Sequence, residues 1–272
     1  MLREPGSTRL AASERWQAWL GQYPTASLAE LADVALPDRM DTKFVLGSET
    51  LMQVLDGLEG LDGSYRILDV DGTRYTSYRT QYFDTESFAL FRRHHAGGSN
   101  RYKLRTRTYL NSGLSFIEIK RRARAGATSK LRLPTARFET ELLEDARAFV
   151  DANCPHPASS FAPSLRNSFD RICLVSDEHR ERLTIDLDIA VEVDGRIVPI
   201  RNVAVAELKQ ERKPGARRQS AFLQAMHAAH QRSTGFSKYC IGLLLTRPEI
   251  KHNLFLPQLK KLRRIMGEPN AV

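Results

Sequence analysis

Residues Arg101–Tyr109 read RYKLRTRTY and contain the most informative pattern of the sequence. Alternate positions of this stretch share one parity and are occupied by Arg101, Lys103, Arg105, Arg107 and Tyr109. A β-strand points successive side chains to opposite faces, so the pattern predicts a strand with a row of cations on one face. Like charges side by side on a sheet destabilise it unless water or an anion relieves the repulsion. The stretch therefore predicts a strand whose charged face meets either solvent or an anion.

The same alternation recurs in four other stretches. Arg182–Ile189 (RLTIDLDI) sets leucines and isoleucines on one face and polar residues on the other, namely Arg182, Thr184, Asp186 and Asp188. The other three stretches place together Glu118 with Lys120, Glu207 with Lys209, and Arg39 with Asp41 and Lys43. One solvated face is normal for an antiparallel sheet, so each strand alone says little. A sheet curled with these faces inward would form a cationic tunnel that fits a polyanion.

The overall charge agrees with an anionic ligand. The 272 residues include 41 Lys and Arg against 32 Asp and Glu, a formal charge of +9. Between Phe91 and Leu133 there are twelve basic residues and one acid, Glu118. Such an excess is typical of proteins that bind nucleic acid, a membrane surface or phosphorylated molecules.

Several classes of protein are excluded by composition. The longest apolar run, at about Cys240–Thr246, is far shorter than the ~18 residues of a membrane span, and Met1–Leu20 has no apolar core typical of a signal peptide. Cys154, Cys173 and Cys240 are widely spaced, which argues against a disulfide framework and a zinc ribbon. We therefore expect a cytoplasmic protein.

The periodicity predicts one α+β domain built on an antiparallel β-barrel with flanking helices. A helical segment over 1–36 precedes this domain, which spans 37–248, and a basic helix lies in 249–272. Strands are expected at about 65–70, 74–83, 100–110, 114–120, 130–133, 164–176, 183–193, 203–209 and 238–245. Helices are expected at about 48–61, 135–151, 216–231 and 257–266.

Common catalytic motifs are absent from the sequence. His95–Asn100 (HAGGSN) is rich in glycine but precedes a strand, so it does not resemble a phosphate-binding loop. His227 and His230 lie three residues apart on a predicted helix, where a plain helix surface explains them better than a metal site. The pair Asp186 and Asp188 is explained by strand alternation.

An ordered set of short motifs resembles the VTC domain, the polyphosphate polymerase domain of the vacuolar transporter chaperone family. The motifs begin with Arg39-x-Asp41-x-Lys43, Tyr82-Phe83-Asp84-Thr85, Lys103-x-Arg105-x-Arg107-x-Tyr109 and Glu118-x-Lys120. They continue with Leu165-Arg166-Asn167, Arg182 before Thr184-x-Asp186, Glu207-x-Lys209 and Ser237-Lys238-Tyr239. The resemblance covers roughly Asp38 to Leu245.

This resemblance implies a triphosphate tunnel fold and the transfer of the γ-phosphate of ATP to a growing polyphosphate chain with a divalent metal, Mn²⁺ or Mg²⁺. The residues that it implies for the phosphate-binding lining are Lys43, Arg105, Arg107, Lys120, Lys130, Arg166, Arg182, Lys209 and Lys238. Of these, Arg105, Arg107 and Lys209 are expected to hold ATP. Glu207 is the implied metal ligand, and Glu118 or Asp186 would assist it.

Two departures from related proteins bear on function. Triphosphatase relatives begin with an E-x-E-x-K motif, whereas this chain has Arg39-x-Asp41-x-Lys43, which favours a polymerase over a hydrolase. The chain also lacks the membrane segments of the large eukaryotic relatives. Coupling to a membrane channel would therefore need a separate membrane protein, and such a partner would place the protein at the inner face of the membrane.

The residues leave other functions open. A triphosphate hydrolase on the same fold and a non-catalytic polyphosphate-binding module are the alternatives. Nucleic acid is not an expected partner, because the basic strand faces hold few aromatic residues and no nucleic-acid motif is present. The expected partners are ATP and inorganic polyphosphate or pyrophosphate.

Overall fold

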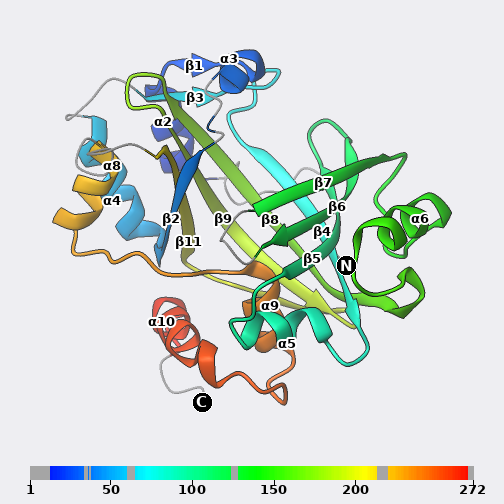
Figure 1. Ribbon diagram of the computed structural model, residues 1–272. Helices are drawn as coiled ribbons and strands as arrows, with labels where there is room; N and C mark the ends of the chain where they lie inside the picture. The colour runs from blue at the N-terminus through cyan, green and yellow to red at the C-terminus, as the bar shows by residue number, and fades with distance from the viewer. Residues whose placement is uncertain are drawn as a thin grey trace.

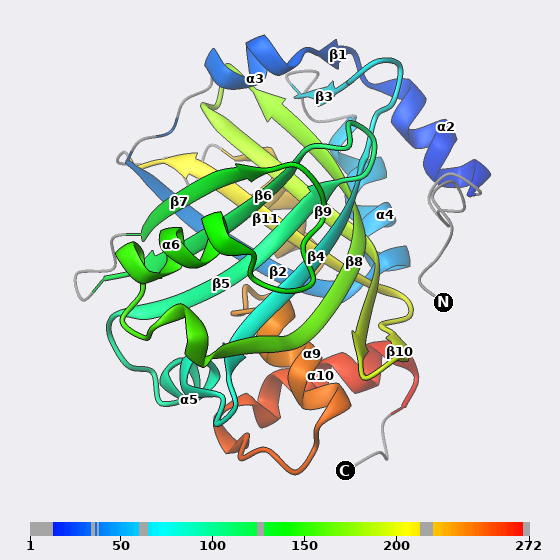
Figure 2. The ribbon, with the colours of Figure 1, turned by 90° about the vertical axis from the view of Figure 1, so that its right-hand side faces the viewer.

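The computed structural model describes residues 13–33, 36, 38–59, 65–123, 128–212 and 220–268. Its centre is one curved sheet of eleven strands (Figures 1 and 2). Residues 1–12 of the expected N-terminal helical segment, Arg124 of the basic run and the start of the helix expected at 216–231 lie outside the described residues.

Eight strands form the main path of the sheet, in the order β2-β11-β9-β8-β4-β5-β6-β7. Neighbours along this path pair antiparallel. Their bounds are β2 Arg39–Gly47, β4 Thr76–Thr85, β5 Arg101–Tyr109, β6 Ser115–Arg122, β7 Thr128–Thr135, β8 Phe161–Ser176, β9 Glu181–Val193 and β11 Val203–Glu211. Three short strands add to it: β1 Thr25–Ala26, β3 Tyr65–Leu68 and β10 Arg196–Pro199.

The expectation of a closed barrel needs correction, because the path of paired strands is open. It ends at β2 and β7, and no backbone pairing joins these two strands within the described ranges. The chain that leads into helix α9 (Lys238–Thr246) runs along the open side of β2 (Figure 1). There the amide of Thr234 donates to the carbonyl of Lys43, and Ser237 Oγ accepts from Lys103 Nζ on β5 at 2.9 Å. This segment thus occupies the edge of β2 that a closing strand would need.

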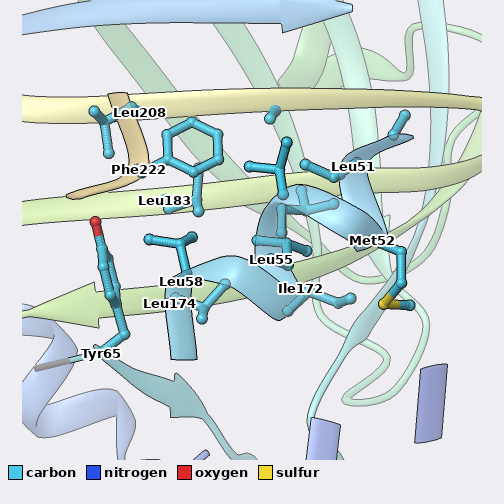
Figure 3. Close-up of a cluster of buried hydrophobic side chains, with 14 of the residues drawn as sticks. Leu51, Met52, Leu55, Leu58, Tyr65, Ile172, Leu174, Leu183, Leu208 and Phe222 are labelled. Atoms are coloured by element: carbon cyan, nitrogen blue, oxygen red, sulfur yellow. The ribbon is translucent and has the colours of Figure 1, made fainter. Parts of the chain in front are cut away.

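The largest hydrophobic cluster covers the outer face of β2, β11, β9 and part of β8. Helix α4 (Ser48–Glu59) contributes Leu51, Met52, Leu55 and Leu58 to it (Figure 3). Helix α8 (Ala221–Ala228) adds Phe222, and helix α2 (Glu14–Gln22) adds Trp19 and Leu20. The short helix α3 (Leu28–Asp33) follows β1. The apolar side of each amphipathic strand is therefore covered by helices.

Helix α6 covers another part of the outer face, and α9 fills part of the inner face. Helix α6 (Glu144–Asn153) packs Ala146 and Val150 against Leu104 and Ile117 of β5 and β6. Helix α9 packs in a second cluster with inward residues of β4, β8 and β9, and α10 (Leu256–Met266) joins that cluster through Leu259 and Leu262. Figure 2 shows α9 at one end of the curved sheet. Thus α9 closes that end with apolar side chains.

The sequence predicted most elements, and the exceptions have physical causes. Residues 238–246 form helix α9, not the expected strand, because Cys240–Leu244 is apolar on all sides and is buried all round. Strand β7 continues to Thr135, so α6 begins nine residues later than expected, at Glu144. Helix α5 (Ala89–His95) and strand β10 were not predicted. Two single turns complete the fold, at Ala158–Ser160 and Asn253–Phe255.

No helix in the described part of the chain is both long enough and apolar enough to span a bilayer.

Candidate functional site

The charged side chains gather on the inner face of the sheet. Strand register fixes this face, because Lys43 pairs with Glu207, Lys209 pairs with Arg182, and Arg105 pairs with Glu118. Directly paired residues of neighbouring strands point to the same face. We call the following set the inner-face cluster: Lys43, Lys103, Arg105, Arg107, Glu118, Lys120, Lys130, Arg171, Asp186, Glu207, Lys209 and Lys238.

Distant strands face one another across this cluster. Glu207 on β11 and Lys120 on β6 are separated by four strands of the sheet order, yet the charge of Glu207 acts on the pKa of Lys120. The charge of Lys43 on β2 likewise acts on the pKa of Lys103 on β5. Such coupling requires the two halves of the sheet to curl toward each other. The cations of separate strands therefore share one electrostatic environment.

Glu118 lies between two cations of neighbouring strands. It accepts from Arg105 Nε at 2.8 Å and is in an ion pair with Lys130 of β7. Its side chain is 1% exposed. Burial raises the pKa of Glu118, but the charges of Arg105, Arg107 and Lys130 outweigh it and hold the pKa at about 2. Glu118 is thus an ionised carboxylate already neutralised by its partners.

Asp186 connects the sheet to helix α9. Arg171 of β8 donates to both of its oxygens, and Lys238 at the start of α9 completes the ion pair. The ammonium of Lys238 also lies 4.2 Å from the ring centre of Phe169, a cation–π contact. Burial raises the pKa of Asp186, but Arg171 and Lys238 lower it more strongly, so that its pKa lies below the usual range.

Glu207 is the third such carboxylate. It is in an ion pair with Lys43 of β2 and lies 3.2 Å from Lys209 Nζ of its own strand. Burial raises the pKa of Glu207, but Lys209 and Lys43 outweigh it, and the pKa falls below the usual range. Each carboxylate of the cluster is therefore held by two cations.

Three cations of the cluster have no carboxylate partner among the residues that the structure describes. Lys103 donates to the hydroxyl of Ser237, and the hydrogen bond of Arg107 from Nε to Thr80 Oγ1 is long, at 3.4 Å. The guanidinium of Arg107 also lies over the rings of Tyr78 and Phe169. The side chain of Lys120 is exposed to solvent, yet neighbouring protein groups reduce its hydration. This desolvation, and after it the charge of Lys103, lowers the pKa of Lys120 to about 8. Burial and then the charge of Arg105 lower the pKa of Arg107 to about 10.

This unbalanced charge defines the chemistry of the face. Burial disfavours the charged forms of these groups, and the neighbouring cations add to that effect, so their pKa values are lowered. A multiply charged anion would reverse that effect and provide the missing hydrogen-bond acceptors. The inner-face cluster is therefore suited to a polyanion such as a triphosphate.

The structure brings together most of the residues that the sequence singled out. Those that meet in the cluster are Lys43, Arg105, Arg107, Lys120, Lys130, Lys209 and Lys238. Arg182 has the same inward parity but lies at the end remote from α9, where its Nη2 donates to the carbonyl of Leu31 at 2.5 Å.

Arg166 needs correction, because it lies on the outer face. It is directly paired with Gln81 and Glu192, contacts both, and lies over the ring of Phe138. Arg171, five residues later, has the opposite parity and takes the inward position. The signal for Arg171 was present, since Ile172 and Leu174 mark the apolar outer side of that half of β8.

The motif Tyr82-Phe83-Asp84-Thr85 has an architectural role. Asp84 is 1% exposed and accepts from the amides of Leu90 and Phe91, at the start of α5. It also accepts from the hydroxyl of Tyr239 in α9 at 2.5 Å. One carboxylate thus anchors two helices at the closed end of the inner face.

The donor set does not form a resident metal centre. In the described ranges, no three His, Cys, Asp or Glu side chains come together, and Glu118 and Glu207 each have their own cation pair. A metal ion that arrives bound to substrate phosphates needs fewer protein ligands. Mg²⁺, for example, often binds through one or two protein carboxylates together with phosphates and water. Glu207, ionised and 16% exposed, fits that requirement.

Comparison with known proteins identifies the family. The VTC domain model matches residues 38–247, and the chain belongs to the VTC domain family. None of the curated proteins matches the sequence.

Solved structures give weaker likenesses. An adenylyl cyclase candidate from Hippeastrum, described as having a dominant triphosphatase activity, shares 15% identity at a TM-score of 0.47, over 79% of this chain and 98% of that one. An adenylate cyclase candidate from Bacillus halodurans shares 14% identity at a TM-score of 0.44, over 73% and 93% of the two chains. A conserved hypothetical protein from Pyrococcus furiosus shares 11% at 0.41, over 72% and 92%.

Proposed function

We propose that this protein is an ATP-dependent polyphosphate polymerase that transfers the γ-phosphate of ATP to a polyphosphate chain on the inner face of its sheet. Membership in the VTC domain family supports this proposal. The observation that carries it is the set of three inward cations, Lys103, Arg107 and Lys120, with no carboxylate partner in the described residues.

Charge balance favours a triphosphate over a singly charged ligand. The inner-face cluster holds nine cationic side chains and three carboxylates. The triphosphate of ATP carries about four negative charges, and Arg and Lys are the usual protein partners of phosphate oxygens. We propose that Arg105, Arg107 and Lys209 hold the triphosphate, with Lys43, Lys120, Lys130 and Lys238 along the same face.

The reaction needs positioning more than proton transfer. An oxygen of the terminal phosphate of the acceptor attacks the γ-phosphorus of ATP, the bond from that phosphorus to the bridging oxygen breaks, and ADP leaves with the electron pair. The attacking oxygen is already ionised at neutral pH, so no general base is required. The cations neutralise charge on the transferred group, which is the main catalytic demand of phosphoryl transfer.

A divalent metal ion would arrive on the phosphates and supply further charge neutralisation. Glu207 is the residue that we propose to contact it. Glu118 and Asp186 are more deeply buried, at 1% and 3% exposure, and we propose that they fix their cations in place.

The test is incubation of the full chain with ATP and Mn²⁺, followed by separation of the products. Long polyphosphate chains would support the polymerase. Orthophosphate as the sole product would identify a triphosphate hydrolase on the same fold. Binding of polyphosphate with no turnover under any metal would identify a non-catalytic binding module.

A further inference from the structure

Asn167 is a buried amide on the inner face that lacks hydrogen-bond partners. It is 1% exposed, and neither its side-chain nitrogen nor its side-chain oxygen has a partner in the described part of the chain. Leaving a buried polar group unpaired destabilises a protein, because the group loses its hydrogen bonds to water and gains none. Native proteins rarely keep such a group without a reason, such as a ligand or an ordered water.

The positive charges around Asn167 indicate that a ligand at this point would be an anion. Strand register pairs it with Thr80 of β4, the residue whose hydroxyl makes the long contact with Arg107. Phe169, two residues along β8, lies under the ammonium of Lys238. Asn167 is thus placed between an incompletely bonded guanidinium and the positively charged start of α9.

Helix α9 limits how far a ligand can extend at this end. A Cβ at Gly242 would lie 2.8 Å from the side chain of Leu165, the inward residue on the other side of Asn167. It would also lie 2.7 Å from Val191, the residue of β9 directly paired with Asn167, so the helix packs tightly against β8 and β9 beside Asn167. A bound chain of phosphates would have its innermost group at this point.

We propose that Asn167 is a phosphate-positioning residue, whose amide donates, together with Arg107, to the innermost phosphate of the bound polyanion. The inference rests on the proposed function, because it takes a phosphate chain as the ligand. The amide nitrogen supplies a neutral donor that fixes the orientation of a phosphate oxygen, whereas Arg107 supplies the charge. The amide nitrogen of Asn167, unpaired in the free protein, then gains a hydrogen-bond acceptor when substrate binds.

The test uses tripolyphosphate binding to the full chain, measured by calorimetry without metal or ATP. Asn167→Leu keeps the approximate size and removes the hydrogen bond, and we expect it to weaken binding about tenfold. Its melting temperature without ligand should not fall below that of the wild type, because an unpaired amide is lost. Asn167→Asp should also bind less tightly, since its carboxylate would pair with Arg107 and repel phosphate.

Gln81→Leu is the matched control. Gln81 is a buried amide on the neighbouring strand, but it faces outward and its nitrogen donates to the carbonyls of Tyr82 and Leu165 at 3.0 and 3.2 Å. This variant should melt at a lower temperature and bind tripolyphosphate normally.

The outcomes separate this inference from the proposed function. Unchanged affinity in Asn167→Leu, or a loss of stability with normal binding, would overturn the role of Asn167 and leave the function standing. Failure of the wild type to bind tripolyphosphate would overturn both.

Discussion

The guanidinium of Arg171 donates to both oxygens of the Asp186 carboxylate, from Nε at 2.5 Å and from Nη2 at 2.7 Å. This bidentate geometry joins β8 to β9 in the centre of the sheet, and Lys238 of α9 shares Oδ2 of the same carboxylate with Arg171 Nη2. The closed end of the inner face is therefore tied to its basic lining by one ion-paired group. Bidentate pairs of an arginine and a carboxylate are among the strongest hydrogen-bonded pairs in proteins.

Substitution of the two arginines of β8 tests the inward register. Arg171→Gln removes one partner of a buried ion pair, so we expect a loss of about 3–5 kcal/mol in the free energy of unfolding. Its tripolyphosphate affinity should fall about tenfold or more, because the inner face loses one positive charge and Asp186 keeps only Lys238 as its cation. Arg166→Gln, on the outer face, should leave affinity unchanged. Thermal unfolding and calorimetry measure both effects, and equal losses of affinity in the two variants would refute the assigned register.

Glu207→Gln separates binding from turnover. The change removes a negative charge from a cationic face, so we expect tripolyphosphate to bind at least as tightly as in the wild type. Turnover of ATP with Mn²⁺ should fall about a hundredfold, since the carboxylate proposed to contact the metal is lost. Glu192→Gln, an outer-face carboxylate in an ion pair with Arg166, is the control and should keep both properties. Full turnover in Glu207→Gln would remove Glu207 from the proposed site.

We expect anion binding to depend on pH because the pKa of Lys120 is lowered. Its pKa in the folded protein is about 8, below the ordinary value of 10.5. Between these two values the unfolded chain binds more protons than the folded one, so this group makes stability rise with pH across that window. Anion binding favours the protonated lysine, and affinity should therefore fall as pH rises through 8.

Trimetaphosphate is the suitable probe for Lys120, because it has no titrating proton in this range. Calorimetric titrations from about pH 7 to about pH 10 should show a fall in affinity for the wild type. Lys120→Met should bind more weakly and show a flatter profile. Parallel profiles for the two proteins would show that another group controls the pH dependence.

Two glycine substitutions test the packing of α9 against the sheet. A Cβ at Gly242 would lie 2.7 Å from a side-chain carbon of Val191 and 2.8 Å from one of Leu165, both within the buried cluster. Gly242→Ala should therefore destabilise the protein by about 1–3 kcal/mol. Gly57→Ala in α4, where nothing lies within 4 Å, should raise stability by about 0.5–1 kcal/mol. Denaturant unfolding measures the free energy of unfolding of both variants. An unchanged free energy of unfolding in Gly242→Ala would show that α9 packs loosely against the sheet.

Strand alternation predicted much of the fold and of the site. The parity of RYKLRTRTY gave the inward set of β5, and that of RLTIDLDI gave Arg182, Thr184 and Asp186 of β9, which the structure places on one face. The alternation predicted for Asp188 and Ile189 was wrong, because the pairing of β8 with β9 shifts register there and Ile189 joins the second hydrophobic cluster, not the first. The same reasoning succeeded for Lys43, Glu207 and Lys209 because β2 and β11 are regular over those residues.

Where the sequence failed, longer-range packing decided the outcome. The run Cys240–Leu244 has no periodicity, so a buried helix and a buried strand look alike in it. Arg166 was chosen over Arg171 by motif resemblance alone, while β8 bears register shifts along its length. Which cations pair with each carboxylate could not be predicted from the sequence either, because that depends on which strands become neighbours.

We propose that cations from separate strands form one binding site for a phosphate polyanion. The decisive experiment is a calorimetric titration of the wild type with tripolyphosphate at physiological salt, repeated in the presence of duplex DNA. We predict saturable binding of one tripolyphosphate per chain that DNA does not weaken. Tight binding of DNA that tripolyphosphate cannot displace, with no saturable heat from tripolyphosphate itself, would contradict the claim.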